Sequence, residues 1–312
     1  MTRLLIELGL SAVLVLAVIV AVALALSSPD RILIVLSAAA APVLSLTLMA
    51  VCAAAYLRHP KLLAALGVAA LSLVGLQWHA WLPQTTAPQA HAAPVRIWFD
   101  NLNVKNGNFD KIARSIARSR ADVVGAADFS DAQAAAADRL FAGLPYRVFG
   151  KSLSQDEPRN VIASRYPLEP LGSAYAGDYA VAAVRVLAPS GPFRLLVLHV
   201  TRPWPFRPQW EQPAQLAQLA RKLNQQPREP VVLVGDFNAT VSGAYLRLFA
   251  RRTGLTPAPA GLGDWPTVLP PPLRMPIENA FAGQGETITA RRLAAGSGSD
   301  HQPIVIEAVR AR

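Results

Sequence analysis

Three long apolar runs near the N-terminus constrain the fold of this chain most strongly. They cover residues 4–26, 32–57 and 62–82. A helix needs about 20 apolar residues to cross the hydrocarbon core of a bilayer. Pro42 lies inside the second run, where a transmembrane helix tolerates a proline. The sequence therefore predicts three transmembrane helices, which form an anchor over residues 1–82.

Two other interpretations of these runs are open. A cleaved signal peptide would account for the first run, but two more runs follow directly and the segment ALALSSPD is a weak cleavage site. Buried helices of a soluble core would account for all three, but such helices are usually shorter. The chain is 52% hydrophobic over 312 residues, and the excess is concentrated in these runs. Three spans are the better prediction.

The basic residues of the short loops predict the orientation. Arg3 precedes the first run, and Arg58 and Lys61 lie between the second and third, whereas the first loop holds one acid and one base, Asp30 and Arg31. Cytoplasmic loops carry the excess of Lys and Arg. We therefore expect a multi-pass protein of the cytoplasmic (inner) membrane, with a cytoplasmic N-terminus and an extracytoplasmic C-terminal domain.

Residues 83–94 (PQTTAPQAHAAP) carry no charged side chain and are typical of a linker. Residues 95–312 then form one domain, which is large enough to bury its own core. Cys52, the only cysteine, lies in the second apolar run, so this domain has no disulfide. The chain has a net charge of +10, and four bases and two acids in residues 1–94 leave +8 for the domain. That charge favours an anionic partner such as a phosphate ester, nucleic acid or lipid headgroup.

Segments with strand and helix periodicity alternate along residues 95–312. We expect strands at 95–101, 122–127, 160–168, 179–187, 193–200, 231–235, 276–282 and 302–310, and helices at 109–119, 131–143, 209–226 and 243–254. Ser130 and Ser242 are predicted to cap the second and fourth of these helices. This order predicts an α/β domain with sheets packed between helices.

Polar side chains follow several of the predicted strands. The clusters are Asn101 with Asn106, Asp128, His199, Asp236 with Asn238, and Asp300 with His301. One such cluster is usually a turn. Strand ends are also where the sites of α/β proteins assemble, and five clusters of acids, amides and histidines are what a phosphate-ester hydrolase needs.

These residue types suit metal-assisted hydrolysis. Aspartates bind Mg²⁺ or Mn²⁺, which would neutralise charge on a phosphoryl oxygen. A histidine beside a carboxylate stabilises developing charge or transfers a proton. Asparagine donates to phosphate oxygens without adding negative charge. Carboxylates without a Cys/His cluster make zinc the poorer prediction.

The segments GDFNAT (235–240) and GSDHQPI (298–304) resemble two motifs of the endonuclease/exonuclease/phosphatase superfamily, which has the deoxyribonuclease-I-like fold. NLNVKN, RADVVGAADFS, NVIASRYPL and DWPTVLPPPLRMPIENAF resemble further parts of that family. The resemblance implies a four-layer α/β sandwich, with two packed β-sheets flanked by helices, over residues 95–312. Membrane-anchored bacterial members are similar in layout.

The resemblance also implies roles for single residues. Asp236 would be the general base or would orient water, Asn238 would contact the scissile phosphate, and His301 would stabilise the transition state. The residues with implied catalytic roles are Asp236, His301, His199, Asn238 and Glu278. The residues implied to bind substrate are Asn101, Asn106 and Asn238. The residues implied to bind Mg²⁺ or Mn²⁺ are Asp128, Asp300 and Asn101.

Two positions depart from the family pattern. Asp128 stands where the family has a metal-binding glutamate, which withdraws the carboxylate by about 1.5 Å. Glu278 stands where the family has an aspartate that holds the catalytic histidine. One acid is shorter and the other longer, so the site is either retuned as a unit or losing its activity.

The sequence thus predicts a membrane-anchored, metal-dependent phosphoesterase that cleaves a phosphodiester of nucleic acid or of a lipid headgroup with metal- and Asp236-activated water. One alternative is a catalytically degenerate domain, tethered to the membrane, that binds phosphorylated ligands or another protein. A second alternative makes the three spans the functional part.

Overall fold

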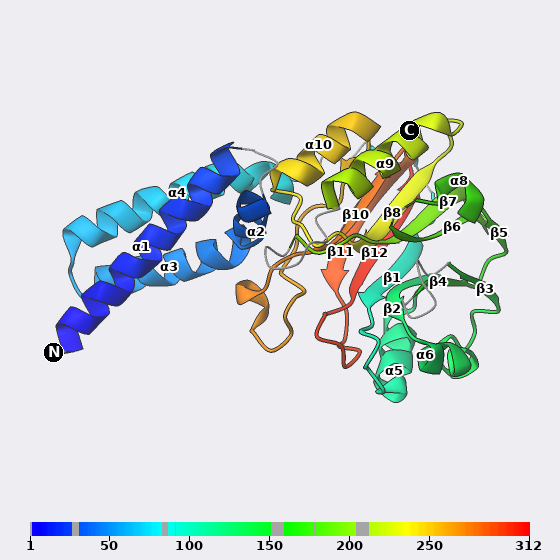
Figure 1. Cartoon of the computed structure of the whole chain (residues 1–312), viewed down its shortest axis with the longest axis horizontal. Coiled ribbons are helices and arrows are strands. Elements are labelled where there is room, and N and C mark those ends of the chain that lie inside the picture. The colour runs from blue at the N-terminus through cyan, green and yellow to red at the C-terminus, as the bar shows by residue number, and fades with distance from the viewer. Residues whose placement is uncertain are drawn as a thin grey trace.

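A computed structural model describes residues 2–26, 31–82, 87–90, 92–150, 159–177, 179–203 and 212–312. The chain forms a slender bundle of helices joined at one end to a larger α/β domain (Figure 1). The N-terminus lies at the far end of the bundle. The loop at 27–30, linker residues 83–86 and 91, and the start of the helix predicted over 209–226 lie outside the described residues.

The bundle consists of α1 (Thr2–Leu26), α2 (Arg31–Ala38), α3 (Ala40–Tyr56) and α4 (Pro60–Trp81). By length and composition, α1 and α4 are each able to cross a membrane, and α2 with α3 would make a third span. The second apolar run is not one straight helix, because α2 and α3 meet at a bend of 56°. Pro42 explains the bend, since a proline has no N–H to donate and its ring collides with the carbonyl four residues earlier, that of Ala38.

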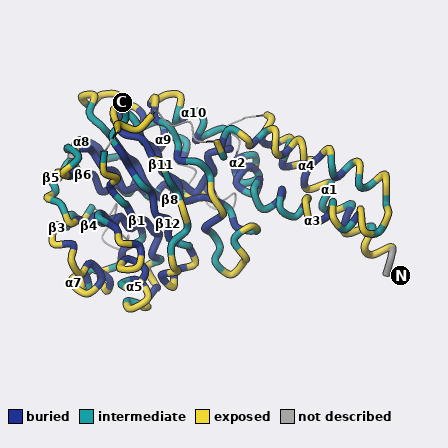
Figure 2. Tube along the Cα trace, turned by 180° about the vertical axis from the view of Figure 1, so that it is seen from behind, coloured by how far each residue is buried: buried dark blue, intermediate teal, exposed yellow. Residues whose placement is uncertain are grey.

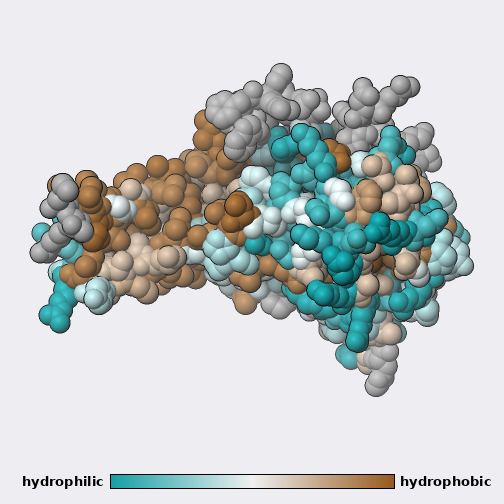
Figure 3. Space-filling view, turned by 90° about the horizontal axis from the view of Figure 1, so that it is seen from below, coloured by the Kyte–Doolittle hydropathy of each residue, from teal (hydrophilic) through white to brown (hydrophobic). Residues whose placement is uncertain are grey.

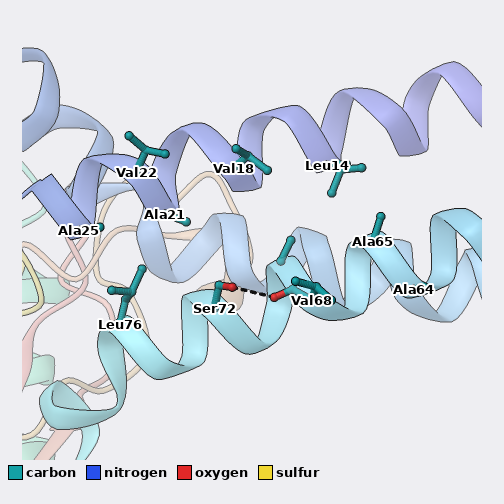
Figure 4. A pocket seen from close by; sticks show the side chains of 11 residues that line it. Leu14, Val18, Ala21, Val22, Ala25, Ala64, Ala65, Val68, Ser72 and Leu76 are labelled. Atoms are coloured by element: carbon teal, nitrogen blue, oxygen red, sulfur yellow. Dashed lines mark hydrogen bonds between the residues drawn. The ribbon is translucent and has the colours of Figure 1, made fainter.

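A groove of about 710 Å³ separates α1 from α4 (Figure 4). Its walls are apolar side chains of both helices, including Leu14, Val18, Val68 and Leu76. Ser72 is the polar residue of the lining, and its hydroxyl donates to the carbonyl of Val68 at 2.9 Å. The lining of the groove is therefore almost entirely apolar.

Two six-stranded mixed sheets form the domain. The first has the order β11-β12-β1-β2-β4-β3 and comprises β1 (Val95–Asn101), β2 (Val123–Phe129), β3 (Tyr146–Phe149), β4 (Arg159–Ser164), β11 (Glu286–Leu293) and β12 (Ile304–Arg310). The second has the order β5-β6-β7-β8-β10-β9 and comprises β5 (Leu168–Pro170), β6 (Ala180–Ala188), β7 (Gly191–His199), β8 (Val231–Asp236), β9 (Thr256–Pro257) and β10 (Glu278–Gly283). Each sheet contains one parallel pair, β1 with β2 and β7 with β8. Parallel neighbours need a long crossover, and here α5 (Phe109–Ser119) and α9 (Gln212–Gln225) supply it.

The two sheets pack face to face over a core that includes Phe99 of β1 and Val197 of β7. Helices α5, α6 (Asp131–Ala135) and α7 (Ala137–Leu140) cover the outer face of the first sheet, where Trp98 is buried. Helices α8 (Gly172–Tyr175), α9 and α10 (Ala244–Thr253) cover the second, where Phe237 is buried. Figure 2 shows the buried strands at the centre and the exposed helix surfaces outside. The four-layer sandwich predicted from the resemblance is confirmed.

Some local predictions differ from the structure. The strand expected over 160–168 is two strands, because β4 ends at Ser164 and β5 joins the other sheet from Leu168. Pro167 disfavours continuation at that point, because a proline has no N–H to donate to a neighbouring strand. Ser130 caps α6 in a capping box with Gln133, as predicted. Ser242 does not cap α10, whose N-cap is Gly243, since its hydroxyl lies 3.2 Å from that of Thr240. Strands β3, β9 and β11 were not predicted.

The bundle and the domain share buried contacts. Ala80, near the end of α4, packs in the core beneath the second sheet, and its carbonyl accepts the N–H of Ala260 at 2.6 Å. The 3-10 turn η1 (Pro271–Leu273) contacts α3. Pro88, within the predicted linker, pairs with Ala311 after β12. The end of α4 is therefore part of the domain's packing.

Candidate active site

Three neighbouring strands place the centre of the site. Asp236 is the last residue of β8, and its register partners are His199 at the end of β7 and Glu278 at the start of β10. Gly235 precedes it within the strand, and a Cβ there would lie 2.4 Å from the carbonyl oxygen of Leu198. The glycine thus allows β7 and β8 to lie close together. The segment VVLVGD is therefore a strand that carries Asp236 at its end.

His301 and Glu278 form a buried pair beside Asp236. Nδ1 of His301 lies 3.2 Å from Oε1 of Glu278, and its Nε2 lies 3.9 Å from Oδ2 of Asp236. Burial would lower the pKa of His301, but the hydrogen bond with Glu278 and the charge of Asp236 outweigh it and raise the pKa to about 10. The imidazole is therefore protonated at neutral pH, and Nε2 carries a positive charge toward Asp236.

His199 and Asp128 form a second, more exposed pair. Nδ1 of His199 lies 2.9 Å from Oδ1 of Asp128, and both side chains are 20% exposed. Nε2 of His199 lies 3.7 Å from Oδ2 of Asp236. Burial opposes protonation, but the charge and hydrogen bond of Asp128 raise the pKa of His199. Two histidines thus approach the same carboxylate oxygen through Nε2.

The backbone at Asp128 has an unusual conformation. Its φ is +50°, and the register between β2 and β4 shifts between Ala126 and Phe129. Aspartate tolerates this left-handed conformation better than most residues with longer side chains. A bulge therefore carries the shorter carboxylate to His199. Burial alone would raise the pKa of Asp128, but His199 and a hydrogen bond with Asn101 lower it.

Asn101, at the end of β1, connects the first sheet to this centre. Its Nδ2 donates to Oδ2 of Asp236 at 3.0 Å, and its backbone N–H donates to Oε1 of Glu278 at 2.9 Å. The other oxygen of Asp236, Oδ1, accepts the N–H of Asn238 at 2.8 Å. Asp236 is only 2% exposed at its side chain, and these bonds fix its orientation.

Three other predicted residues have different partners. Nδ2 of Asn238 donates to the carbonyl of Val200 at 2.9 Å. Nδ2 of Asn106 donates to the carbonyl of Ser297 at 3.5 Å. The carboxylate of Asp300 accepts from Nδ2 of Asn103 at 2.8 Å and from Nε1 of Trp265 at 3.1 Å. Burial would raise the pKa of Asp300, but these two hydrogen bonds lower it. The roles predicted for Asn238, Asn106 and Asp300 stay predictions.

Two buried residues that the sequence reasoning missed hold Glu278 in place. Oδ1 of Asp264 accepts the backbone N–H of Glu278 at 3.1 Å. Nη2 of Arg291 donates to Oδ2 of Asp264 at 3.0 Å and to the carbonyl of Glu278 at 2.9 Å. Burial and the nearby Glu278 raise the pKa of Asp264 to about 8. The DWP segment held a signal for Asp264, whereas Arg291 lies on the unpredicted β11.

Trp265 was also missed, although the resemblance drew on its segment. Its ring centroid lies 6.3 Å from that of His301, and its indole N–H holds Asp300. It therefore covers one side of the buried His301–Glu278 pair.

The donor set fits a hydrated divalent cation. No group of three or more His, Cys, Asp and Glu side chains is arranged to hold a metal within the described ranges. Mg²⁺ needs fewer, because it keeps several waters and binds through one or two carboxylates plus substrate phosphate. Asp128 is partly exposed, its pKa is lowered, and Asn101 lies beside it. These two residues would hold the ion, and Asp300, the third predicted ligand, accepts hydrogen bonds from Asn103 and Trp265 while its metal role stays a prediction.

Solved structures share this fold at low sequence identity. An endonuclease/exonuclease/phosphatase from Beutenbergia cavernae is 19% identical with a TM-score of 0.53, over 70% of this chain and 72% of that one. The endonuclease domain of the TRAS1 retrotransposon is 15% identical with a TM-score of 0.54, over 70% and 99%. Beta toxin from Staphylococcus aureus, with bound magnesium ions, is 12% identical with a TM-score of 0.52, over 70% and 100%.

No curated protein matches the chain by sequence. Residues 101–301, which run from the asparagine of β1 to the histidine before β12, match the Endonuclease/Exonuclease/phosphatase family. The match covers more than half of the chain and spans every residue of the centre around Asp236. The chain belongs to the endonuclease/exonuclease/phosphatase family.

Proposed function

We propose that this chain is a membrane-anchored, metal-dependent phosphodiester hydrolase. One observation carries the proposal: the Nε2 atoms of two histidines approach Oδ2 of the fixed Asp236 carboxylate, at 3.7 Å for His199 and 3.9 Å for His301. Each histidine is backed at Nδ1 by its own carboxylate. This arrangement suits a water nucleophile and a phosphoryl group that gains negative charge.

Each residue then has a separate task. Asp236 orients the attacking water and accepts its proton. His301, protonated and buried, stabilises the developing charge on a phosphoryl oxygen, and Glu278 keeps it protonated. His199 lies on the more open side, where it holds or moves a proton at Nε2 near the leaving group. A cation bound at Asp128 and Asn101 would supply further neutralisation of phosphate charge.

The bundle supports a membrane location with the domain outside. The N-terminus of α1 and the connection between α3 and α4 lie at the end away from the domain (Figure 1). That connection carries Arg58 and Lys61. Basic loops favour the cytoplasmic side, which supports our proposal that the domain lies on the opposite face.

The test is hydrolysis of bis-p-nitrophenyl phosphate by the full chain in detergent micelles. We expect turnover with Mg²⁺ or Mn²⁺, loss of turnover with chelator, and loss in Asp236→Asn. Asp138→Asn is the matched control, because that carboxylate is 97% exposed and pairs with Arg147 away from the site. No turnover in the unchanged chain, with every metal tried, would refute the proposal and leave a phosphate-ligand or protein-binding domain.

A further inference from the structure

One segment links the candidate site to the helix bundle. It runs from Leu262 to Leu273 in the connection between β9 and β10, and we name it the junction loop. At one end, Trp265 lies against His301 and donates to Asp300. At the other end, η1 contacts α3. Fewer than ten residues therefore separate Trp265, which lies against His301, from η1, which packs on the candidate membrane helix α3.

The junction loop exposes apolar side chains. Val268 is 86% exposed, Leu262 55% and Leu269 39%. The segment VLPPPL, residues 268–273, contains no charged residue. A cluster of large apolar side chains facing water is unfavourable, so such clusters mark surfaces that contact a partner or a membrane.

The exposure is built into the fold. Arg274 is only 8% exposed, and its guanidinium donates to the carbonyl of Leu269 at 2.5 Å and to that of Thr267 at 3.1 Å. Thr267 is held in turn, because its N–H donates to the carbonyl of Asp300 at 2.9 Å. Val268 thus projects outward between two residues whose backbones are fixed.

The position of the loop identifies its partner. η1 lies beside the end of α3 nearest the domain (Figure 1), which is where the bundle would leave the bilayer. Figure 3 shows that the hydrophobic surface of the helices continues onto the adjoining edge of the domain. Where the helices cross a membrane, this edge meets the interfacial layer of the same membrane.

Resting on the proposed function, we propose that the junction loop inserts Val268 and Leu269 into the outer surface of the bilayer that the helices cross, and thereby presents the site to phosphodiesters of lipid headgroups. The domain's net charge of +8 adds attraction to anionic headgroups. Anchor and loop together hold the domain at two points, which fixes the height of the Asp236 centre above the membrane.

The first test locates Val268 without using activity. Val268→Cys is made in a Cys52→Ser background, labelled with an environment-sensitive fluorophore, and reconstituted in vesicles of phosphatidylethanolamine and phosphatidylglycerol. We expect the emission of the fluorophore at position 268 to be shifted to shorter wavelength, relative to the same fluorophore at an exposed position away from the membrane. We also expect spin-labelled lipid to quench it. Leu187→Cys, one residue before the end of β6, is the control, because Leu187 is 38% exposed and lies at the opposite end of the β6–β7 pair from His199. Equal quenching at both sites would overturn the proposal.

The second test compares substrates in the same vesicles. The unchanged chain should release phosphorylated headgroup from the vesicle lipids. Val268→Ser combined with Leu269→Ser should lower that rate about 10-fold, because less apolar surface anchors the loop. Hydrolysis of soluble bis-p-nitrophenyl phosphate should stay within about twofold, since neither side chain contacts the site, and Leu187→Ser should change neither rate.

The outcomes separate the two proposals. Failure on bis-p-nitrophenyl phosphate would refute the hydrolase itself. Activity on that compound and on DNA, without release from vesicle lipids, would leave the hydrolase standing and overturn the lipid assignment. An equal loss on soluble and vesicle substrates in the double variant would show that the junction loop supports the fold rather than the membrane contact.

Discussion

Two histidine–carboxylate pairs flank Asp236, and they differ in burial. The His301–Glu278 pair is closed off, with exposed fractions of 7% and 0%, whereas both members of the His199–Asp128 pair are 20% exposed. Water screens the charge of the open pair more than that of the closed one. The same residue types therefore suit different purposes: the closed pair suits a fixed positive charge, whereas the open pair suits the proton transfer and cation binding proposed above.

The pairs also differ in how the backbone delivers the carboxylate. Glu278 starts β10 in regular register opposite Asp236, and its long side chain reaches His301. Asp128 has a short side chain, and a bulge with φ +50° brings it to His199. Compared with the family pattern, one acid is longer and one is shorter, yet both meet their histidine. This supports a site retuned as a unit rather than one decaying.

The largest expected effect removes the residue that both pairs share. Asp236→Asn keeps the shape and the contact with Asn101 but removes the proton acceptor. We expect kcat/KM on bis-p-nitrophenyl phosphate to fall about 10³-fold or more. Thermal unfolding in micelles should show that the variant is folded, and substantial turnover in a folded variant would contradict the assignment of Asp236.

The next largest effect compares the two pairs directly, through the loss of activity when each histidine is replaced. His301→Gln should lower kcat/KM about 10²- to 10³-fold, because a preorganised charge in a water-excluded position is lost. His199→Gln should cost about 10-fold, because its position is open to water. Steady-state kinetics on both variants measures the ratio. A larger loss in His199→Gln would reverse the comparison.

A pH profile sharpens the comparison further. The pKa of His301 is raised to about 10, so its charged form, and the activity that needs it, should persist to alkaline pH. Glu278→Gln removes the carboxylate charge, so this pKa falls toward its ordinary 6.5 and the alkaline limb of kcat/KM moves to lower pH. We expect the variant to lose about 10-fold more activity at pH 9 than at pH 6. Parallel profiles would contradict the role given to Glu278.

The smallest effect is on stability. The folded pKa of His301 lies above its unfolded value, so the stabilisation is fully present below about pH 6.5 and disappears as pH rises through about 10. The unfolding midpoint of the unchanged chain should therefore fall between pH 7 and 10, by roughly 2–4 °C for each kcal/mol lost. Differential scanning calorimetry in micelles measures how the unfolding midpoint changes with pH. Glu278→Gln should make this dependence weaker, and Asp128→Asn should leave it unchanged.

Much of this arrangement followed from the sequence because it depends on local pattern. Apolar strands that end in Asp236 and Asn101 predicted where those side chains would lie, and the motif around His301 predicted the family. Contacts set by tertiary register did not follow. The bulge at Asp128 has no sequence signature, and the path of Arg291 to Glu278 depends on β11, whose polar sequence does not resemble a buried strand.

The bend between α2 and α3 shows the same limit in the bundle. Pro42 was recognised in the apolar run, but its effect depends on what the helix packs against. Transmembrane helices tolerate proline with or without a kink. Here the break lies at Ala39, so composition predicted an apolar helical segment but not its shape.

Ala80 makes the stability of the α/β domain depend on the helix bundle. The residue lies one position before the end of α4, and it completes the core beneath the second sheet and accepts the N–H of Ala260 at its carbonyl. A protease that cut the chain between α4 and β1 would release a domain with an unfilled position in its core and an unpaired amide. Release would therefore cost the domain folding stability, and we expect the uncut chain, with α4 in place, to persist longer.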